Sequence, residues 1–284
     1  MVVRLITAVA AIPLILFMLF QPVPQFFCVL ITVACVLGMH EMFQLLQSRG
    51  HRPYVVFGYT MAVAIHISVY QGVPRFPLST VLMQPMALIT ILVMGLLLML
   101  LARGRVEDNV VSLGFTLFAV LYVSWLSSFI IRLRAVPEGA QWVFLLIVIT
   151  WVFDSGAYAW GTAFGRTKMW LDISPGKSWE GFWGGTITTL AVVWLAKEVP
   201  EMFPSLPRLF PTATNTAHLM ILTILGCAAA QLGDLVESMM KRYSRLKDSG
   251  GIFPGHGGVL DRLDSFLFTG PLVFFDAIIT IGLR

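Results

Sequence analysis

Long apolar runs constrain the fold of this 284-residue chain more than any other feature of its sequence. Nine runs approach the roughly 20 residues that a helix needs to cross the hydrocarbon core of a bilayer. They lie at residues 3–20, 26–46, 54–70, 82–101, 112–131, 141–160, 181–197, 217–236 and 265–283. A composition of 57% apolar and 12% charged residues excludes an ordinary soluble domain. We therefore predict an all-α polytopic integral membrane protein with about nine transmembrane helices.

The first run and the three cysteines fit this prediction. Pro13 interrupts the first run, which continues into QPVPQ without a small-residue cleavage site, so we do not expect a cleavable signal peptide. Cys28, Cys35 and Cys227 lie inside apolar runs and have neither disulfide nor metal-binding spacing. We expect them to pack as small apolar side chains.

The distribution of Lys and Arg predicts the orientation of the chain. With a cytoplasmic N-terminus and nine crossings, thirteen of the 19 Lys and Arg residues fall on the cytoplasmic side and six on the other. This count depends on the run at 181–197, which is short and begins with glycines. We expect N-terminal transmembrane helices in residues 1–140 and a C-terminal transmembrane region in 141–284. The second region then presents two cytoplasmic loops, at 164–180 and 234–264.

The segment 231–265 concentrates charge and glycine in a chain that is otherwise mostly apolar. Its carboxylates are those of Asp234, Glu237, Asp248, Asp261 and Asp264, and its cations are Lys241, Arg242, Arg245, Lys247 and Arg262. Five glycines, Pro254 and His256 complete a loop that no membrane helix tolerates. Asp154 lies near the same face, where an intramembrane carboxylate costs about 2.5–3.5 kcal/mol and usually has a partner or a function.

The spacing of the acids predicts a metal site. Asp261 and Asp264 are three residues apart at the expected start of the last helix, so they share one helix face. Asp234, Glu237 and Ser238 have the same relation at the end of the preceding helix. If the loop brings the two helix ends together, their oxygens face each other, as Mg²⁺ prefers. Lysine, arginine and glycine beside such a site predict phosphate chemistry.

Each feature also has an ordinary structural interpretation. The cations are also what the positive-inside rule places on a cytoplasmic loop. Asp261, Arg262 and Asp264 are also typical of capping and ion pairing at a helix start. His256 between glycines is also typical of a turn, and Asp154 of a hydrogen-bonded structural carboxylate. The co-occurrence of all these features in one loop favours the functional interpretation.

The stretch SMMKRYSRLKDSGGIFPGHGGVLDRLDS closely resembles the signature of the phosphatidate cytidylyltransferases, also called CDP-diacylglycerol synthases. The signature is met without a spacing error at Ser238, Lys241, Arg242, Lys247, Asp248, Gly250, Pro254, His256, Gly257, Gly258, Asp261, Arg262 and Asp264. Upstream, LGDLVES and DSGAYAWGTAFGRTKMWLDISPGKSWEG resemble other segments of that family. The resemblance covers roughly the C-terminal half, whereas residues 1–140 match only in being apolar.

This resemblance implies the Mg²⁺-dependent reaction of CTP with phosphatidic acid to give CDP-diacylglycerol and pyrophosphate. The metal ligands would be Asp234, Asp261, Asp264 and Asp154, and a second cation stays open. The catalytic and phosphate-neutralising residues would be His256, Lys241, Arg242, Lys247, Asp248 and Arg262. The residues that bind the nucleotide or the metal-bound phosphates would be Ser174, Lys177, Ser178, Ser238, Gly257 and Gly258. No protein nucleophile is needed, so catalysis would consist of positioning and charge neutralisation.

The expected partners are CTP, phosphatidic acid and membrane lipids, with no nucleic acid, and a homodimer stays open. The expected location is a bacterial inner membrane. Two alternatives remain. The first is cytidylyl transfer to an isoprenoid lipid phosphate on the same scaffold. The second, from a different class, is an ion-coupled transporter, which would explain Asp154 and broken helices but not the charged, glycine-rich loop.

Overall fold

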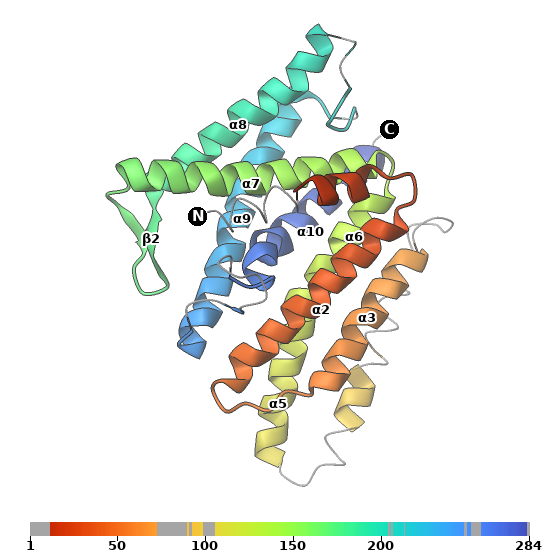
Figure 1. Cartoon of the computed structure of the whole chain (residues 1–284), viewed down its shortest axis with the longest axis vertical. Helices are drawn as coiled ribbons and strands as arrows, with labels where there is room; N and C mark the ends of the chain where they lie inside the picture. The colour runs from red at the N-terminus through yellow and green to blue at the C-terminus, as the bar shows by residue number, and fades with distance from the viewer. Residues whose placement is uncertain are drawn as a thin grey trace. The chain divides into compact units, whose positions relative to one another are not determined.

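The computed structural model describes residues 12–72, 90, 93–98, 106–203, 205, 207–212, 214–246, 249–250 and 257–282, which are almost entirely helical (Figure 1). The helices are α2 (Gln25–Gln47), α3 (Val55–Gly72), α5 (Val106–Ala119), the π-helical turn η1 (Val120–Trp125), α6 (Leu126–Ala135), α7 (Gly139–Phe164), α8 (Trp179–Met202), α9 (Thr216–Ser244) and α10 (Leu260–Gly282). Two short strands, β1 (Lys168–Trp170) and β2 (Ser174–Ser178), lie between α7 and α8.

Five helical stretches of the described chain are long and apolar enough to cross a membrane, which confirms the prediction of a helical integral membrane protein. They are Gln25–Gln47, Asn109–Ala135, Gly139–Phe164, Thr216–Ser244 and Leu260–Gly282. The helix at Val55–Tyr70 is also apolar but shorter.

The expected crossings at 3–20, 82–101 and 181–197 are not among these stretches of the described chain. The run at 181–197 is helical as part of α8, which is not among the five stretches. Residues 12–20, 90 and 93–98 are helical, and the remaining parts of the expected runs at 3–20 and 82–101 lie outside the described residues.

The chain divides into two compact units. The first unit comprises Met1–Ala135 with Tyr243–Leu263, and the second comprises Val136–Arg242 with Asp264–Arg284. Helix α10 therefore contributes its first turn to the first unit and its remainder to the second.

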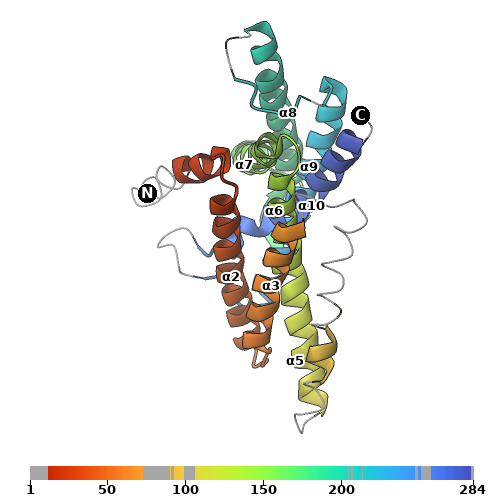
Figure 2. The ribbon, with the colours of Figure 1, turned by 90° about the vertical axis from the view of Figure 1, so that its right-hand side faces the viewer.

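The first unit packs α2 and α3 as neighbours joined by residues 48–54, against the continuous helix formed by α5, η1 and α6 (Figure 1, Figure 2). Helix α2 follows Pro24, a position where the missing N–H of proline costs no helical hydrogen bond. His66 of α3 faces the π-helical turn, with its Nε2 3.2 Å from the carbonyl oxygen of Ser124 and 3.1 Å from Ser127 Oγ. These contacts place polar partners beside a turn whose backbone hydrogen-bond pattern is irregular.

The second unit contains α7, α8, most of α9 and most of α10, and small residues bring α7 and α8 together. A Cβ atom added at Gly185 of α8 would lie 2.8 Å from the backbone nitrogen of Ala157 on α7. A Cβ added at Gly156 would lie 3.1 Å from the Cα of Gly185. Such close approach of two helix backbones through small residues is typical of membrane interiors, where van der Waals packing drives association.

Part of the segment 164–180, which we predicted to be a loop, forms a two-stranded antiparallel hairpin. Lys168 pairs with Ser178 and Trp170 with Ser174. Helix α9 also continues to Ser244, so the connection before α10 is shorter than the loop expected at 234–264.

Candidate active site

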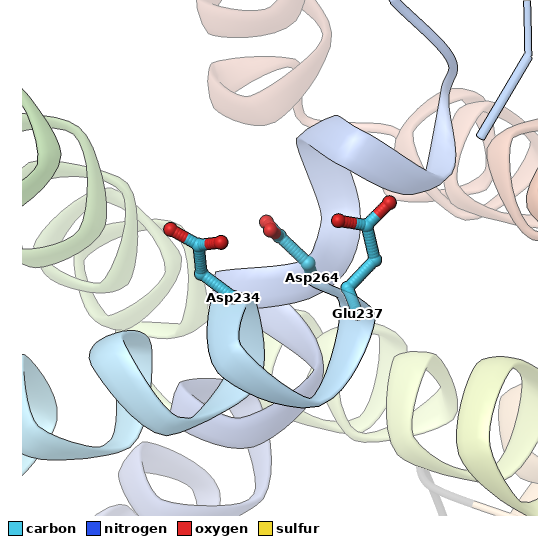
Figure 3. Close-up of side chains that lie close together, drawn as sticks. All are labelled: Asp234, Glu237 and Asp264. Carbon is cyan, nitrogen blue, oxygen red and sulfur yellow. The ribbon is translucent and has the colours of Figure 1, made fainter. Parts of the chain in front are cut away.

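Three carboxylates from α9 and α10 gather at one point of the second unit. Asp234 and Glu237 lie one turn apart on α9, and Asp264 lies in the second turn of α10. One oxygen of each side chain lies within 4.8 Å of the others, and the three point to the same side of the two helices (Figure 3). Glu237 and Asp264 are buried, whereas Asp234 is half-buried.

Local contacts orient these carboxylates. Asp234 Oδ1 accepts a hydrogen bond of 3.2 Å from the hydroxyl of Ser238, one turn further along α9. Asp264 Oδ1 accepts one of 2.6 Å from the backbone N–H of Ser265. Helices α9 and α10 meet at Gly233, where a Cβ atom would collide with the backbone carbonyl of Asp264. The missing side chain thus lets the two acidic helix segments approach.

Two lysines supply positive charge to the cluster. Lys177 Nζ of β2 lies 2.7 Å from Asp234 Oδ2, and Lys241 pairs with Glu237 one turn before it on α9. Three carboxylates therefore face two ammonium groups among the described residues. Because buried charge is costly unless it is balanced, the cluster suits one more cation.

The hairpin that carries Lys177 is anchored at several points. Arg242 Nε donates a hydrogen bond of 3.1 Å to the carbonyl oxygen of Ile173. Ser178 caps α8, since its hydroxyl accepts a hydrogen bond of 3.2 Å from the N–H of Gly181. Ser174 lies in β2 opposite Trp170. These contacts hold the hairpin against α9, with Lys177 at Asp234 and Arg242 at Ile173.

Glu180 closes the other end of the hairpin. Its carboxylate accepts hydrogen bonds from the backbone N–H groups of Arg166 and Thr167, at 3.0–3.2 Å. The pKa of Glu180 is lowered, first by a hydrogen bond from its own backbone N–H and further by Thr167 and Arg166. Glu180 therefore fixes the start of the hairpin relative to α8.

Asp154 lies beyond the three-carboxylate cluster but within its electrostatic reach. It is exposed on α7, and its charge acts on the carboxyl group of Asp264. The structure thus puts Asp154 in the surroundings of the cluster, and its role as a metal ligand stays a prediction.

Asp261 has a different set of contacts from the one its spacing suggested. Its Oδ2 accepts hydrogen bonds from the N–H of Gly258 (2.7 Å), the hydroxyl of Ser249 (2.9 Å) and the N–H of Ser249 (3.2 Å). Gly257 adopts a φ of +76°, and a Cβ there would meet Asp261 Oδ2 at 2.7 Å. Asp261 therefore holds the end of the glycine-rich loop, and its role as a metal ligand stays a prediction.

The remaining predicted site residues fall into two groups. Arg262 is exposed in the first turn of α10. Lys247, Asp248 and His256 lie outside the described residues. Their predicted roles in phosphate binding and proton transfer stay predictions.

Glu237 is a member of the cluster that the predicted ligand set left out. The signal was present, because Glu237 follows Asp234 by three residues on one helix face. The cluster of Asp234, Glu237 and Asp264 consists of oxygen ligands from carboxylates, which suit Mg²⁺ better than a softer metal ion. These three side chains fit a hard divalent cation and are the ones that would hold it.

The fold and the site define an all-α membrane protein with an acidic cluster lined by lysines. The chain belongs to the cytidylyltransferase family, whose model matches residues 2–279.

Among curated proteins, the chain is 39% identical over 163 residues to phosphatidate cytidylyltransferase of Bacillus subtilis (strain 168). This alignment covers 57% of each of the two chains. It is 41% identical over 160 residues to the protein of that name from Staphylococcus epidermidis (strain ATCC 12228 / FDA PCI 1200), and equally to that from Staphylococcus aureus (strain COL). Each of these alignments covers 56% of this chain and 57% of the relative. The chain thus aligns with a little over half the length of these relatives.

Proposed function

We propose that this protein transfers the cytidylyl group of CTP to phosphatidic acid, giving CDP-diacylglycerol and pyrophosphate for phospholipid biosynthesis. The observation that carries the proposal is the meeting of Asp234, Glu237 and Asp264, on two apolar helices, beside Lys177. Relatives that are named phosphatidate cytidylyltransferase support the same reaction. The proposed activity therefore joins a water-soluble nucleotide to a lipid at a membrane surface.

The reaction needs positioning and charge neutralisation rather than a protein nucleophile. A phosphate oxygen of phosphatidic acid forms a bond to the α-phosphorus of CTP, while the bond from that phosphorus to the oxygen of the leaving pyrophosphate breaks. Lys177, Lys241 and Arg242 supply cations along this path, on the hairpin and on α9. Their charges would offset those of the phosphates as the pyrophosphate leaves.

Mg²⁺ is the cofactor that we propose for this site, held by Asp234, Glu237 and Asp264. When bound, it supplies Lewis-acid stabilisation of phosphate oxygens. The two lysines would then exchange part of their contact with carboxylates for contact with phosphates. Asp154, whose charge acts on the carboxyl group of Asp264, is the further acid of the second unit that a second cation would use.

We further propose nine crossings, with the N-terminus and both polar segments in the cytoplasm of a bacterial cell, at its inner membrane. This topology depends on α8, and two contacts support α8 as a crossing. Lys177 lies just before α8 and pairs with Asp234, in the second half of α9. Glu198, near the end of α8, accepts a hydrogen bond of 2.9 Å from Thr216, at the start of α9.

These two contacts involve the first residue of α9 and a residue in its second half. From Thr216 to Asp234 the helix rises roughly 27 Å at 1.5 Å per residue, close to the thickness of a hydrocarbon core. Helix α8 therefore covers the same distance in the opposite direction. With this topology, CTP reaches the cluster from the cytoplasm, and phosphatidic acid reaches it from the adjoining leaflet.

A label-transfer assay in detergent micelles tests this proposal. The purified protein is incubated with Mg²⁺, phosphatidic acid and CTP labelled at either the α- or the γ-phosphate. We expect label in the lipid phase from α-labelled CTP alone, and none when EDTA replaces Mg²⁺. Label that enters lipid only when polyprenyl phosphate replaces phosphatidic acid would favour the isoprenoid acceptor. The absence of both label transfer and CTP binding would contradict cytidylyl transfer altogether.

A further inference from the structure

A buried glutamate of α2 binds the start of α10 within the first unit. Glu41 is fully buried, although it lies on a largely apolar helix. Its Oε1 accepts a hydrogen bond of 2.9 Å from the N–H of Val259, and its Oε2 accepts one of 2.8 Å from the N–H of Leu260. These N–H groups belong to the helix start, where no helical carbonyl is available to them. A carboxylate there also interacts favourably with the helix dipole.

The same carboxylate reaches the other side of the glycine-rich loop. The hydroxyl of Ser249 lies 3.1 Å from Glu41 Oε2 and 2.9 Å from Asp261 Oδ2. This hydroxyl has one proton, so it donates to one carboxylate at a time. Ser249 thus lies between Glu41 and Asp261, and Glu41 contacts the chain both before and after residues 251–256.

Two glycines of the signature leave room for this carboxylate. A Cβ atom at Gly250 would collide with Glu41 Oε1 and lie 2.6 Å from its Cδ. A Cβ at Gly258 would collide with Glu41 Oε2 and with Ser249 Oγ. The space that a side chain would fill at each position is taken by Glu41, which accounts for glycine at both.

We propose that Glu41 is a positioning residue for cytidylyl transfer, and this inference rests on the proposed function. Its two hydrogen bonds fix the first turn of α10, and Asp264 lies on the same helix one turn after Leu260. A change in the direction or phase of that first turn would therefore move the carboxylate of Asp264. Glu41 acts through the backbone of α10 and does not need to touch a substrate.

The carboxylate form of the side chain matters because it offers two acceptor oxygens to two N–H donors. In Glu41→Gln, one oxygen becomes an NH₂ group that faces an N–H of Val259 or Leu260. The substitution preserves size and shape but removes one hydrogen bond and adds a repulsive contact. Glu201→Gln is a matched control, because Glu201 is half-exposed in an ion pair with Lys197 at the end of α8.

Hydrogen–deuterium exchange of the full-length protein in micelles provides a test that does not depend on activity. In Glu41→Gln, we expect peptides covering residues 257–266 to exchange about tenfold faster, while peptides from α7 keep the wild-type rate. The Glu201→Gln control should match the wild type in both regions. Uniform acceleration over all helices would show a general loss of stability and would overturn the positioning role.

Kinetics of the same variants test the link to catalysis. We expect Glu41→Gln to lower kcat about tenfold or more, with KM for CTP changed less than about threefold, because a misplaced carboxylate slows the reaction more than it weakens substrate binding. Unchanged kcat together with faster exchange at 257–266 would overturn the proposal. If Glu41→Gln does not fold, Ser249→Ala takes its place, and wild-type exchange and kcat in that variant would count against the proposal.

The two hypotheses fail in different ways. If the wild type forms no CDP-diacylglycerol, the proposed function is wrong, and the exchange data still decide whether Glu41 holds the start of α10. If the wild type is active and Glu41→Gln is equally active, the positioning role alone is wrong.

Discussion

Lys177 and Lys168 lie on the two strands of one hairpin but differ in their contacts. Lys177 Nζ pairs with Asp234 at 2.7 Å, whereas the side chain of Lys168 is exposed. We expect Lys177→Gln to lower kcat/KM on the order of 100-fold, because it removes a cation that the proposed reaction puts beside the phosphates. Lys168→Gln should leave kcat/KM within about twofold of the wild type. Steady-state kinetics with CTP as the varied substrate measures both, and equal kinetics in the two variants would remove Lys177 from the site.

At the level of single residues, the sequence predicts the acidic cluster better than its surroundings. Asp234 and Asp264 could be identified because their spacing to neighbouring acids follows the helix period. Glu41 could not be paired with the loop, because Ser249 and Val259 follow it by 208 and 218 residues. In the sequence it is a carboxylate in the amphipathic turn with His40 and Gln44 that follows the apolar part of the run, and this turn does not show what Glu41 contacts. Asp261 was assigned by spacing alone, which does not reveal the N–H groups of Gly258 and Ser249 that it binds.

At the level of elements, the contact between α7 and α8 gives a prediction about stability. A Cβ at Gly185 would press against the backbone of α7, whereas no described atom lies within 4 Å of a Cβ at Gly114 on α5. Both Gly→Ala substitutions raise helix propensity by about 1 kcal/mol. At Gly185 the new Cβ meets backbone atoms, which cannot rotate away, so the clash should cost about 2–3 kcal/mol, which exceeds this gain, and the melting temperature of Gly185→Ala should fall. Gly114→Ala should melt at or above the wild-type temperature, and the same melting temperature in both variants would contradict close packing at Gly185.

The loop that Glu41 holds gives a second prediction, as a double-mutant cycle. Gly250→Ala should lower the melting temperature of the wild type, because the new Cβ meets the Glu41 carboxylate. In the Glu41→Ala background that carboxylate is absent, so Gly250→Ala should have little effect. We expect a coupling on the order of 1–2 kcal/mol between the two positions. Additive effects on melting temperature would show that Gly250 and Glu41 do not share this space.

The helices could be predicted from the sequence more completely than the hairpin. The apolar runs identify α2, α7, α9 and α10 because membrane-spanning helices carry a long and simple signal. Polar residues extend α9 to Ser244, since a helix does not have to end where the hydrocarbon ends. Strands β1 and β2 are short and lack an alternating apolar pattern, so nothing in their sequence distinguishes them from a loop.

At the level of the whole molecule, the proposed topology predicts which side of the membrane each loop faces. Cys28, Cys35 and Cys227 are buried, so they should react little with a membrane-impermeant thiol reagent. Asp172→Cys, on the exposed hairpin, should react only in inside-out vesicles. Arg208→Cys, between α8 and α9, should react only in right-side-out vesicles. Reaction of both cysteines from the same side would show that α8 does not cross the membrane.

In the proposed function, the carboxylates of α9 and α10 hold the metal ion for cytidylyl transfer. The Mg²⁺ dependence of CDP-diacylglycerol formation by the wild type, Asp264→Asn and Asp276→Asn tests this role. Asp276 is a matched control, because it lies on the same helix and binds His218 at 3.0 Å instead of joining the cluster.

We expect Asp264→Asn to fold but to lose at least about 100-fold in rate at every Mg²⁺ concentration, because a metal-holding oxygen is lost. Asp276→Asn should keep the Mg²⁺ dependence of the wild type. A folded Asp264→Asn variant with the rate and Mg²⁺ dependence of the wild type would contradict the account.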